Sequence, residues 1–126
     1  MRGQTMEERC NTSVLDLDVL KGVTQDDPEF EREFIRDLIR DCEALFEKMI
    51  AVLKKEDLDG FVSLIHQYRG IIQYVAAESV SLFVIDTDDQ ARLRSTPPSE
   101  QEFARLKQDF VLVKQALNQH IQTLGE

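Results

Sequence analysis

Hydrophobic residues recur every three or four positions along most of the chain, which is the spacing of one face of an α-helix. The clearest run has its apolar positions 3, 4, 3, 4 and 3 residues apart, at Leu58, Phe61, Ile65, Tyr68, Ile72 and Val75. This run predicts an amphipathic helix that begins at Asp57 or Leu58 and ends near Tyr74 or Val75.

Two longer apolar patterns lie on either side of this run. One predicts a helix from Pro28 to about Lys55, with its buried face at Phe30, Phe34, Leu38, Cys42, Leu45, Met49 and Leu53. The other predicts a helix from about Ser99 to the end of the chain, where Gly125 closes it, with its buried face at Phe103, Leu106, Phe110, Val113, Leu117, Ile121 and Leu124. Both are long enough to pack along the full length of a bundle.

Helix-start signals support these boundaries. Asp27 precedes Pro28, and an acidic N-cap followed by proline in the first turn is a common helix start. Ser99 and Glu102 have the spacing of a capping box, in which each side chain bonds the backbone N–H of the other residue. The segment 95–98, which ends in two prolines, is predicted to be a linker.

Two segments give weaker signals. A short apolar pattern from Ser13 predicts a helix that covers the core and ends at Gly22 as its C-cap. The segment from Glu78 to about Leu93 is rich in β-branched residues, but a lone strand among helices would leave its backbone groups unpaired, so we interpret it as a helix. Its acidic stretch at 86–89 is a candidate breakpoint.

These elements together predict the fold class and the domain organisation. Four long helices joined by short turns favour an all-α, antiparallel four-helix bundle with a short additional N-terminal helix. The bundle domain is predicted to span residues 13–126. Residues 1–12 are polar and without periodicity, so they are predicted to form a flexible leader.

Composition excludes several classes of partner. A chain of 126 residues fits one domain, and its 24 acidic against 15 basic residues give a net charge of −9, which disfavours nucleic acid and anionic membranes. No apolar run approaches the roughly 18 residues of a membrane span, and no signal-peptide core is present. We therefore expect a cytoplasmic protein that can also enter a nucleus. Cys10 and Cys42 lie in different contexts and are not expected to form a disulfide.

The most informative side chain is His66. At about 100° per residue, the centre of the 58–75 apolar face lies near Ile65, and His66 points about 130° away from it, toward solvent. A glycine in the middle of a helix costs about 1 kcal/mol, and Gly70 lies one turn after His66, where it leaves the imidazole uncovered. The neighbouring positions on this surface are Val62, Ser63, Arg69 and Gln73.

Such an arrangement suits a group that meets another protein and carries an anion. A histidine near neutral pH is partly unprotonated and can act as a nucleophile, and Arg69 would stabilise a phosphoryl group bound to it. The alternative is a solvent-facing histidine beside a chance glycine. Spacing alone does not decide between these two interpretations.

The run from His66 through Gln, Tyr and Arg69 to Gly70, followed by Val75, Ala and Ala77, resembles the signature of histidine-containing phosphotransfer (HPt) domains. The likeness covers roughly residues 13–124 through the order and length of the helices. In that family a lysine follows the histidine at the third position and a glycine at the fourth. Here Arg69 replaces the lysine and keeps its charge, Ile71 and Ile72 replace small residues, and Ala76 replaces a glycine.

The resemblance implies a phosphocarrier rather than an enzyme. His66 would relay a phosphoryl group between aspartates of receiver domains, in a response regulator or a hybrid histidine kinase. It implies no cofactor in this chain, because Mg²⁺ and the acidic pocket belong to the receiver. The receiver would dock weakly and transiently over His66 and the flanking Val62, Ile71 and Tyr74. We expect the carrier to be a monomer.

Two alternatives to phosphotransfer stay open. One is an adaptor with the same fold that binds receivers without passing phosphate, because Ile71 and Ala76 narrow the approach of a receiver to His66. The other is an unrelated four-helix interaction module with an accidental motif.

Metal chemistry finds little support in the sequence. Di-iron bundles need Glu-x-x-His pairs, but Ser63 and Leu117 stand three residues before His66 and His120. His120 is predicted to lie at the surface or the core boundary. Most acidic residues are expected on solvated helix faces, and those at positions 86, 88 and 89 lack the spacing of a calcium loop.

Overall fold

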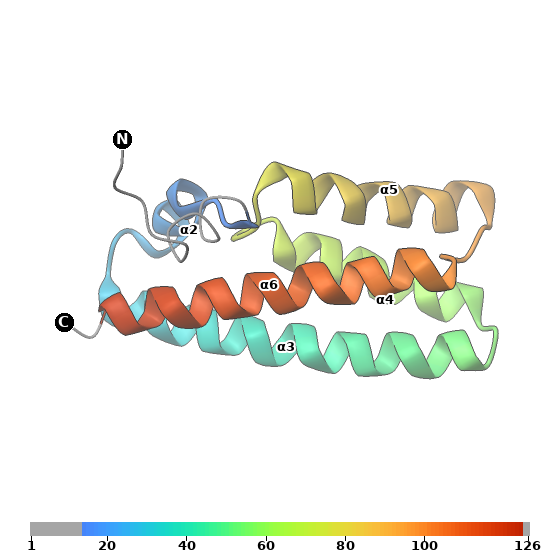
Figure 1. The fold of residues 1–126 in the computed structure, drawn as a ribbon, viewed down its shortest axis with the longest axis horizontal. Coiled ribbons are helices and arrows are strands. Elements are labelled where there is room, and N and C mark those ends of the chain that lie inside the picture. The colour runs from blue at the N-terminus through green and yellow to red at the C-terminus, as the bar shows by residue number, and fades with distance from the viewer. Residues whose placement is uncertain (1–13, 125–126) are drawn as a thin grey trace.

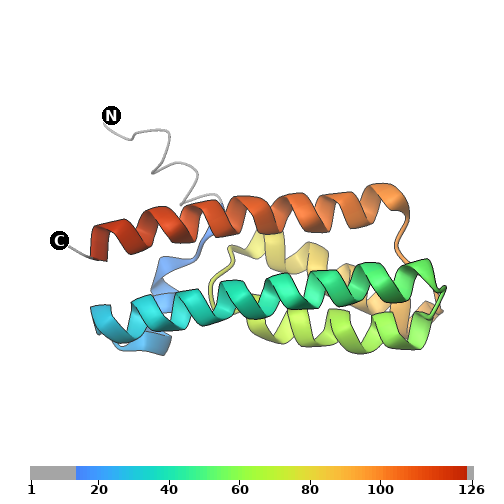
Figure 2. The same cartoon turned by 90° about the horizontal axis from the view of Figure 1, so that it is seen from below.

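The computed structural model describes residues 14–124, which form a helical bundle (Figure 1). Its helices are α2 (Leu17–Thr24), α3 (Pro28–Lys54), α4 (Leu58–Ile72), α5 (Glu78–Arg94) and α6 (Glu100–Leu124). The chain reverses at each turn, and α3 packs against α4 and α6 while α5 packs against α4 and α6. The short α2 lies at the end of the bundle where α3 begins and α6 finishes (Figures 1 and 2). This confirms the predicted all-α architecture.

The predicted starts of α3, α4 and α6 are also confirmed, and each is capped by a side chain. The short helix predicted from Ser13 begins only at Leu17, and α5 begins without a side-chain cap. The carboxylate of Asp27 accepts hydrogen bonds from the N–H groups of Glu29 (3.1 Å) and Phe30 (3.2 Å) at the start of α3. Asp57 accepts from the N–H of Gly60 (2.9 Å) at the start of α4. At the start of α6, Ser99 and Glu102 form the reciprocal capping box. Each cap satisfies N–H groups that have no partner within their own helix.

The first short helix differs from its prediction. We expected Gly22 to end it, but α2 continues to Thr24 and its C-cap is Gln25, which adopts the left-handed conformation with φ 56°. Thr24 is fully buried, and its hydroxyl lies 3.1 Å from the carbonyl oxygen of Leu20. Burial of Thr24 therefore extends the helix past an exposed glycine that would otherwise favour a stop.

The helix α4 ends at Ile72, two or three residues earlier than predicted. The segment after it pairs with the chain that precedes α2 instead of extending the helix. Asp16 donates its N–H to the carbonyl of Val75 (2.8 Å), and Ala77 donates to Val14 (2.8 Å). Ala76 is buried in this pairing, opposite Leu15.

The helix α5 is continuous through its acidic stretch, so the proposed breakpoint is wrong. Thr87 bonds back to the carbonyl of Phe83 (2.9 Å), and Arg92 bonds Asp89 (2.8 Å) on the same helix. These contacts satisfy the polar side chains that would otherwise compete with the helix for backbone hydrogen bonds.

The core lies between the four long helices. Its largest fully buried apolar side chains are Leu20, Ile35, Met49, Phe61, Ile65, Tyr68, Ile72, Leu106 and Leu117. Burial raises the pKa of the Cys42 thiol to about 12, with the charges of Asp41 and Glu43 adding to the shift. Phe30 was predicted to line the core but is exposed, whereas the next residue, Glu31, is buried, so the first turn of α3 turns Glu31 and not Phe30 toward the interior.

Some predictions fall outside the described residues: the flexible leader at 1–12, the domain boundary at Ser13, Cys10 and the closing Gly125. Within residues 14–124, no helix is long and apolar enough to cross a membrane.

Candidate functional site

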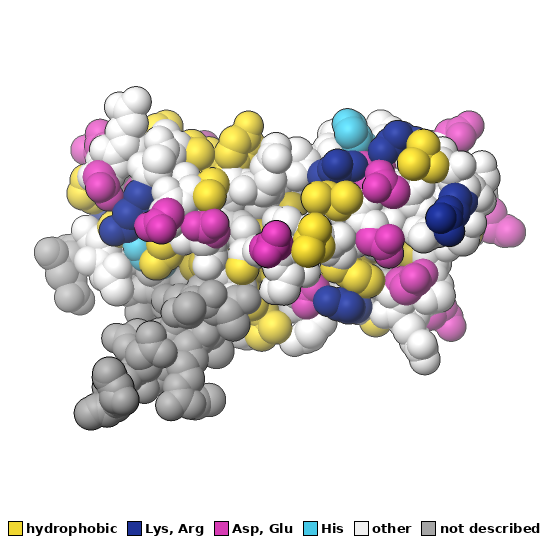
Figure 3. All heavy atoms as spheres, turned by 90° about the horizontal axis from the view of Figure 1, so that it is seen from above, with side chains coloured by type: hydrophobic (Ala, Val, Ile, Leu, Met, Phe, Trp, Pro, Cys, Tyr) yellow, Lys and Arg dark blue, Asp and Glu magenta, His cyan; other side chains and the backbone are white. Residues whose placement is uncertain are grey.

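His66 lies on the outer face of α4, as its helical phase predicted. Its side chain is 65% exposed, whereas the neighbouring Ile65 and Tyr68 on the inner face are fully buried. On the surface seen from above, basic and acidic side chains gather beside an exposed histidine (Figure 3). The helix therefore presents the imidazole to any partner that approaches this side of the bundle.

Gly70 leaves open space one turn after His66. A Cβ atom added at Gly70 would have no other heavy atom within 4 Å, apart from the helix's own backbone nearby. The next turn holds Gln73, whose amide donates to the Gly70 carbonyl (2.9 Å) and so lies along the helix. The surface on the C-terminal side of His66 is therefore uncovered.

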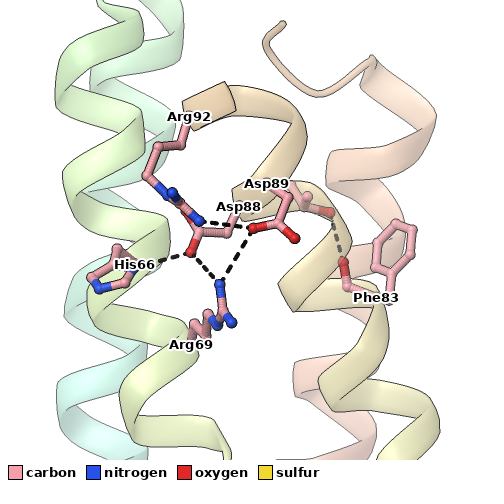
Figure 4. Close-up of polar contacts among 7 residues, drawn as sticks. His66, Arg69, Phe83, Asp88, Asp89 and Arg92 are labelled. Carbon is pink, nitrogen blue, oxygen red and sulfur yellow. Dashed lines mark hydrogen bonds and ion pairs between the residues drawn. The ribbon is translucent and has the colours of Figure 1, made fainter. Parts of the chain in front are cut away.

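The inner edge of the imidazole meets a carboxylate from the neighbouring helix. His66 Nδ1 lies 3.0 Å from Oδ2 of Asp88 on α5, and the side chain of Asp88 has 0% exposure. Arg69, one turn along α4, donates to the same Oδ2 at 3.0 Å. The close-up shows His66 and Arg69 converging on Asp88, while the other ring nitrogen of His66 points away from it (Figure 4).

A second carboxylate and a second guanidinium complete this charge network. Arg69 Nη1 is 3.5 Å from Asp89 Oδ1, and Arg92 Nη2 is 2.8 Å from the same oxygen. Arg92 Nε lies 3.7 Å from Oδ1 of Asp88, an oxygen for which the described residues provide no hydrogen-bond donor within range. The two arginines and two aspartates balance each other in charge around the imidazole.

These contacts determine the protonation state of Asp88. Burial by itself would raise the pKa of Asp88, but the hydrogen bonds from His66 and Arg69 and the nearby charge of Arg92 outweigh it and hold that pKa below its usual value. Asp88 is therefore a carboxylate near neutral pH and can only accept hydrogen bonds. In the neutral ring of His66, Nδ1 then donates to this carboxylate, and Nε2 is the nitrogen with a lone pair on the exposed side.

The remaining predicted site residues are distributed around His66. Arg69 is half-buried and forms ion pairs with two aspartates. Ser63 is exposed and Val62 is partly buried on the preceding turn. Ile71 packs partly against the core, and Tyr74 is exposed beyond it, with its ring 6.4 Å from that of Phe34. Ala76 is buried, and it pairs with Leu15 of the segment that precedes α2.

Sequence reasoning missed Asp88, which it placed on a solvated helix face. The residue is 22 positions from His66, so no local spacing links the two. The one local signal was the spacing of Asp88 and Arg92, which pairs them on one face of α5. That spacing does not reveal that the face turns toward α4.

The second histidine has a different environment. His120 was predicted to lie at the surface or the core boundary, but it is buried, and its Nε2 pairs with Glu31 of α3. Thr24 of α2 donates to the other oxygen of Glu31 (2.8 Å). Three helices thus enclose His120 and Glu31, because α2 covers this end of the bundle.

The described part of the chain offers no group of three or more His, Cys, Asp or Glu side chains placed to hold a metal ion. It has a surface pocket near the turn between α3 and α4, but His66 does not line it. The pocket is lined mainly by apolar side chains, among them Ile50, Leu53, Leu58, Pro97, Pro98 and Phe103.

Comparison with known proteins identifies the fold. No protein-family model matches the sequence, and no curated protein does. The structure is similar to the crystal structure of histidine-containing phosphotransfer protein B (HptB) from Pseudomonas aeruginosa PAO1, with a TM-score of 0.77 over 86% of this chain and 95% of that chain. The two sequences are 16% identical. The chain therefore has the HPt fold, a short N-terminal helix with four long packed helices, and the resemblance seen in the sequence is confirmed for the fold.

Proposed function

We propose that this protein is a phosphocarrier that accepts a phosphoryl group on Nε2 of His66 and passes it to an aspartate of a receiver domain. The observation that carries the proposal is the outward Nε2 of an imidazole whose Nδ1 is bound to a buried carboxylate. The HPt fold supports the same conclusion, because a phosphotransfer protein has this arrangement of helices.

The chemistry of acceptance needs few groups from this chain. The lone pair of Nε2 attacks the phosphorus of an aspartyl phosphate in line with the P–O bond. A P–N bond forms, the P–O bond breaks, and the aspartate leaves as a carboxylate. The partner's Mg²⁺ and acidic pocket would supply most of the charge stabilisation, and the reverse sequence transfers the group onward.

Arg69 is the basic group best placed to assist. Its guanidinium reaches the same carboxylate oxygen as His66, so it lies on the imidazole's side of α4. An arginine at this place can hydrogen-bond the phosphoryl oxygens once a partner has docked. The predicted docking surface around His66 also includes Val62, Ser63, Gly70 and Gln73.

The partners follow from this chemistry. They would be receiver domains of a response regulator, a hybrid histidine kinase or both, and the protein would act in the cytoplasm where such receivers work. The open space beside Gly70 permits close approach. No feature of the described surface specifically favours an adaptor that binds receivers without transfer.

Transfer from phosphorylated receivers tests the proposal. A panel of receiver domains carrying labelled phosphate is incubated with this protein and Mg²⁺, and label on the protein is followed with time. We expect acid-labile, alkali-stable label, as a phosphoramidate gives, and none on a His66→Gln variant. Acid-stable label would indicate a hydroxyl such as that of Ser63, and binding without transfer would indicate an adaptor. The absence of both would reject the proposal.

A further inference from the structure

Arg69 is turned toward α5, on the inner side of the imidazole. Its Nη1 contacts Oδ2 of Asp88 at 3.0 Å and Oδ1 of Asp89 at 3.5 Å (Figure 4). Oδ2 of Asp88 also meets the inner ring nitrogen of His66, whereas Nε2, the proposed phosphoryl site, lies on the outer side of the ring. The guanidinium is therefore held by two carboxylates and has to turn outward to bind a phosphoryl group on Nε2.

Asp89 holds Arg69 in a different way from Asp88. The side chain of Asp88 has 0% exposure, whereas that of Asp89 is 42% exposed. Arg92, three residues along the same helix, lies 2.8 Å from the Asp89 oxygen that Arg69 contacts, so Asp89 keeps a cationic partner when Arg69 moves. An exposed carboxylate with a second partner releases a guanidinium at low cost, and a fully buried one does not.

We propose that Asp89 is a positioning residue that retains Arg69 in the unphosphorylated protein and releases it to the phosphoryl group on His66. This inference rests on the proposed function and adds a residue to it. Asp89 touches neither the imidazole nor the reacting atoms and acts through Arg69. Its effect is to make His66 a weaker acceptor and a better donor of the phosphoryl group.

The effect follows from competition between two anions for one cation. The Asp89 carboxylate and the phosphoryl oxygens are both strong acceptors for a guanidinium, and the phosphoryl group carries the larger negative charge. Acceptance breaks the contact between Arg69 and Asp89, and donation restores it. The free energy of this contact therefore opposes acceptance and favours donation by the same amount.

Two substitutions test whether Asp89 acts through Arg69. Asp89→Asn removes the competing charge and keeps the shape of the side chain, and it is made both in the wild type and in an Arg69→Gln background. The matched control is Asp86→Asn, the same chemical change at an exposed position of α5 outside the ion-pair network. Circular dichroism and thermal unfolding establish that each variant is folded.

The first measurement needs no phosphate. Nitrogen-15 relaxation of the Nε–H group reports how tightly the Arg69 side chain is held. We expect a restrained Arg69 in the wild type and in Asp86→Asn, and a more mobile one in Asp89→Asn. An Arg69 side chain that is equally mobile in the wild type and in Asp89→Asn would overturn the retention by Asp89.

The second measurement is the equilibrium constant for phosphoryl exchange with one receiver, approached from both directions. We expect Asp89→Asn to shift this equilibrium toward phosphorylated His66 by about 2- to 5-fold, the range that an exposed ion pair supports. Asp86→Asn should leave it unchanged. In the Arg69→Gln background, Asp89→Asn should have no effect, because the contact that it removes is already absent.

Two results would overturn the inference. One is a wild-type equilibrium constant in Asp89→Asn. The other is the same shift in the Arg69→Gln background, which would show that Asp89 repels the phosphoryl group directly instead of competing for Arg69. If no receiver phosphorylates the wild type, the proposed function fails and the effect on transfer fails with it, while the relaxation measurement still decides whether Asp89 retains Arg69.

Discussion

The bundle contains two histidine–carboxylate pairs that differ in how they meet solvent. His66 and Asp88 join α4 to α5, with the imidazole 65% exposed and the carboxylate 0% exposed. His120 and Glu31 join α6 to α3, and their side chains are 9% and 2% exposed. In the first pair an exposed imidazole bonds a buried carboxylate, whereas in the second pair both groups are buried.

The two pairs also use different ring nitrogens. His66 bonds its carboxylate through Nδ1 and leaves Nε2 outside, whereas His120 uses Nε2 for Glu31. Thr24 occupies the other oxygen of Glu31, so that this pair ties α2, α3 and α6 together. The same two residue types therefore leave a ring nitrogen exposed in one place and hold helices together in the other. The difference lies in whether a ring nitrogen remains exposed to solvent.

Replacing each histidine in turn tests this division of roles most strongly. We expect His66→Gln to abolish phosphoryl acceptance and to change the free energy of unfolding by no more than about 0.5 kcal/mol, because the ring is largely exposed. His120→Gln should accept label but unfold at a lower temperature. Labelling and thermal unfolding are measured on the same preparations. Unfolding of the His66 variant, or loss of labelling in a folded His120 variant, would contradict the division.

Removing the enclosed carboxylate should have the largest effect on stability. Glu31→Ala leaves His120 and Thr24 without their acceptor, and loss of one member of a buried pair costs about 3 kcal/mol. Glu29→Ala is the matched control in the same helical turn. Glu29 is exposed, so the control should lose only the helix-dipole interaction, about 0.5 kcal/mol. Chemical denaturation measures both, and equal losses would show that the enclosed pair is not a structural bond.

Much of the fold was predictable because helices and their starts depend on local sequence. Three- and four-residue spacing located α3, α4 and α6, and the caps at Asp27 and Ser99 are confirmed. The outward direction of His66 followed from helical geometry, since the phase of one helix relative to its own apolar face needs no other helix. The function of the site residues stays a prediction.

The errors arose where one helix meets another. Most acidic residues were expected on solvated faces, but Asp88 and Glu31 are each buried opposite a histidine, 22 and 89 residues away in sequence. His120 was expected near the surface because it lies between the core positions 117 and 121 of α6. Its burial depends on α2 and α3, and the spacing within α6 contains no information about how they pack.

A leucine at position 70 would cover His66, and the His66–Asp88 pair would then be shielded from solvent, as the His120–Glu31 pair is. A Cβ atom at this position meets nothing within 4 Å beyond the nearby helix backbone, so a side chain fits there, and leucine is a better helix former by up to about 1 kcal/mol. It would also cover the approach to His66. We expect Gly70→Leu to unfold at a higher temperature and to transfer phosphate much more slowly.

Gly22→Leu provides the matched control for this substitution. Gly22 lies in α2 with the same open space, so the variant should gain helix stability without slowing transfer. Thermal unfolding and transfer from one receiver are compared among the three proteins. Wild-type kinetics in a folded Gly70→Leu protein would show that Gly70 does not keep the approach open. A loss of stability would show that this face contacts another part of the molecule.

The smallest expected effect is the acid dependence of the exposed pair. Because the hydrogen bonds from His66 and Arg69 and the charge of Arg92 outweigh burial, the pKa of Asp88 is lower in the folded protein than in the unfolded chain. Asp88 ionisation therefore stabilises the fold fully above its unfolded pKa, about 3.9, and this contribution is lost as pH falls through the folded pKa.

Asp88→Asn lacks the ionisation, so its free energy of unfolding should fall less steeply below about pH 4. The difference in free energy of unfolding between the wild type and this variant should therefore shrink. Asp109, whose pKa burial raises despite its ion pair with Arg105, is present in both and cancels in that difference. Urea denaturation at a series of pH values measures the two curves. Parallel curves through the acid range would mean that the network of His66, Arg69, Asp89 and Arg92 does not favour the ionised form of Asp88.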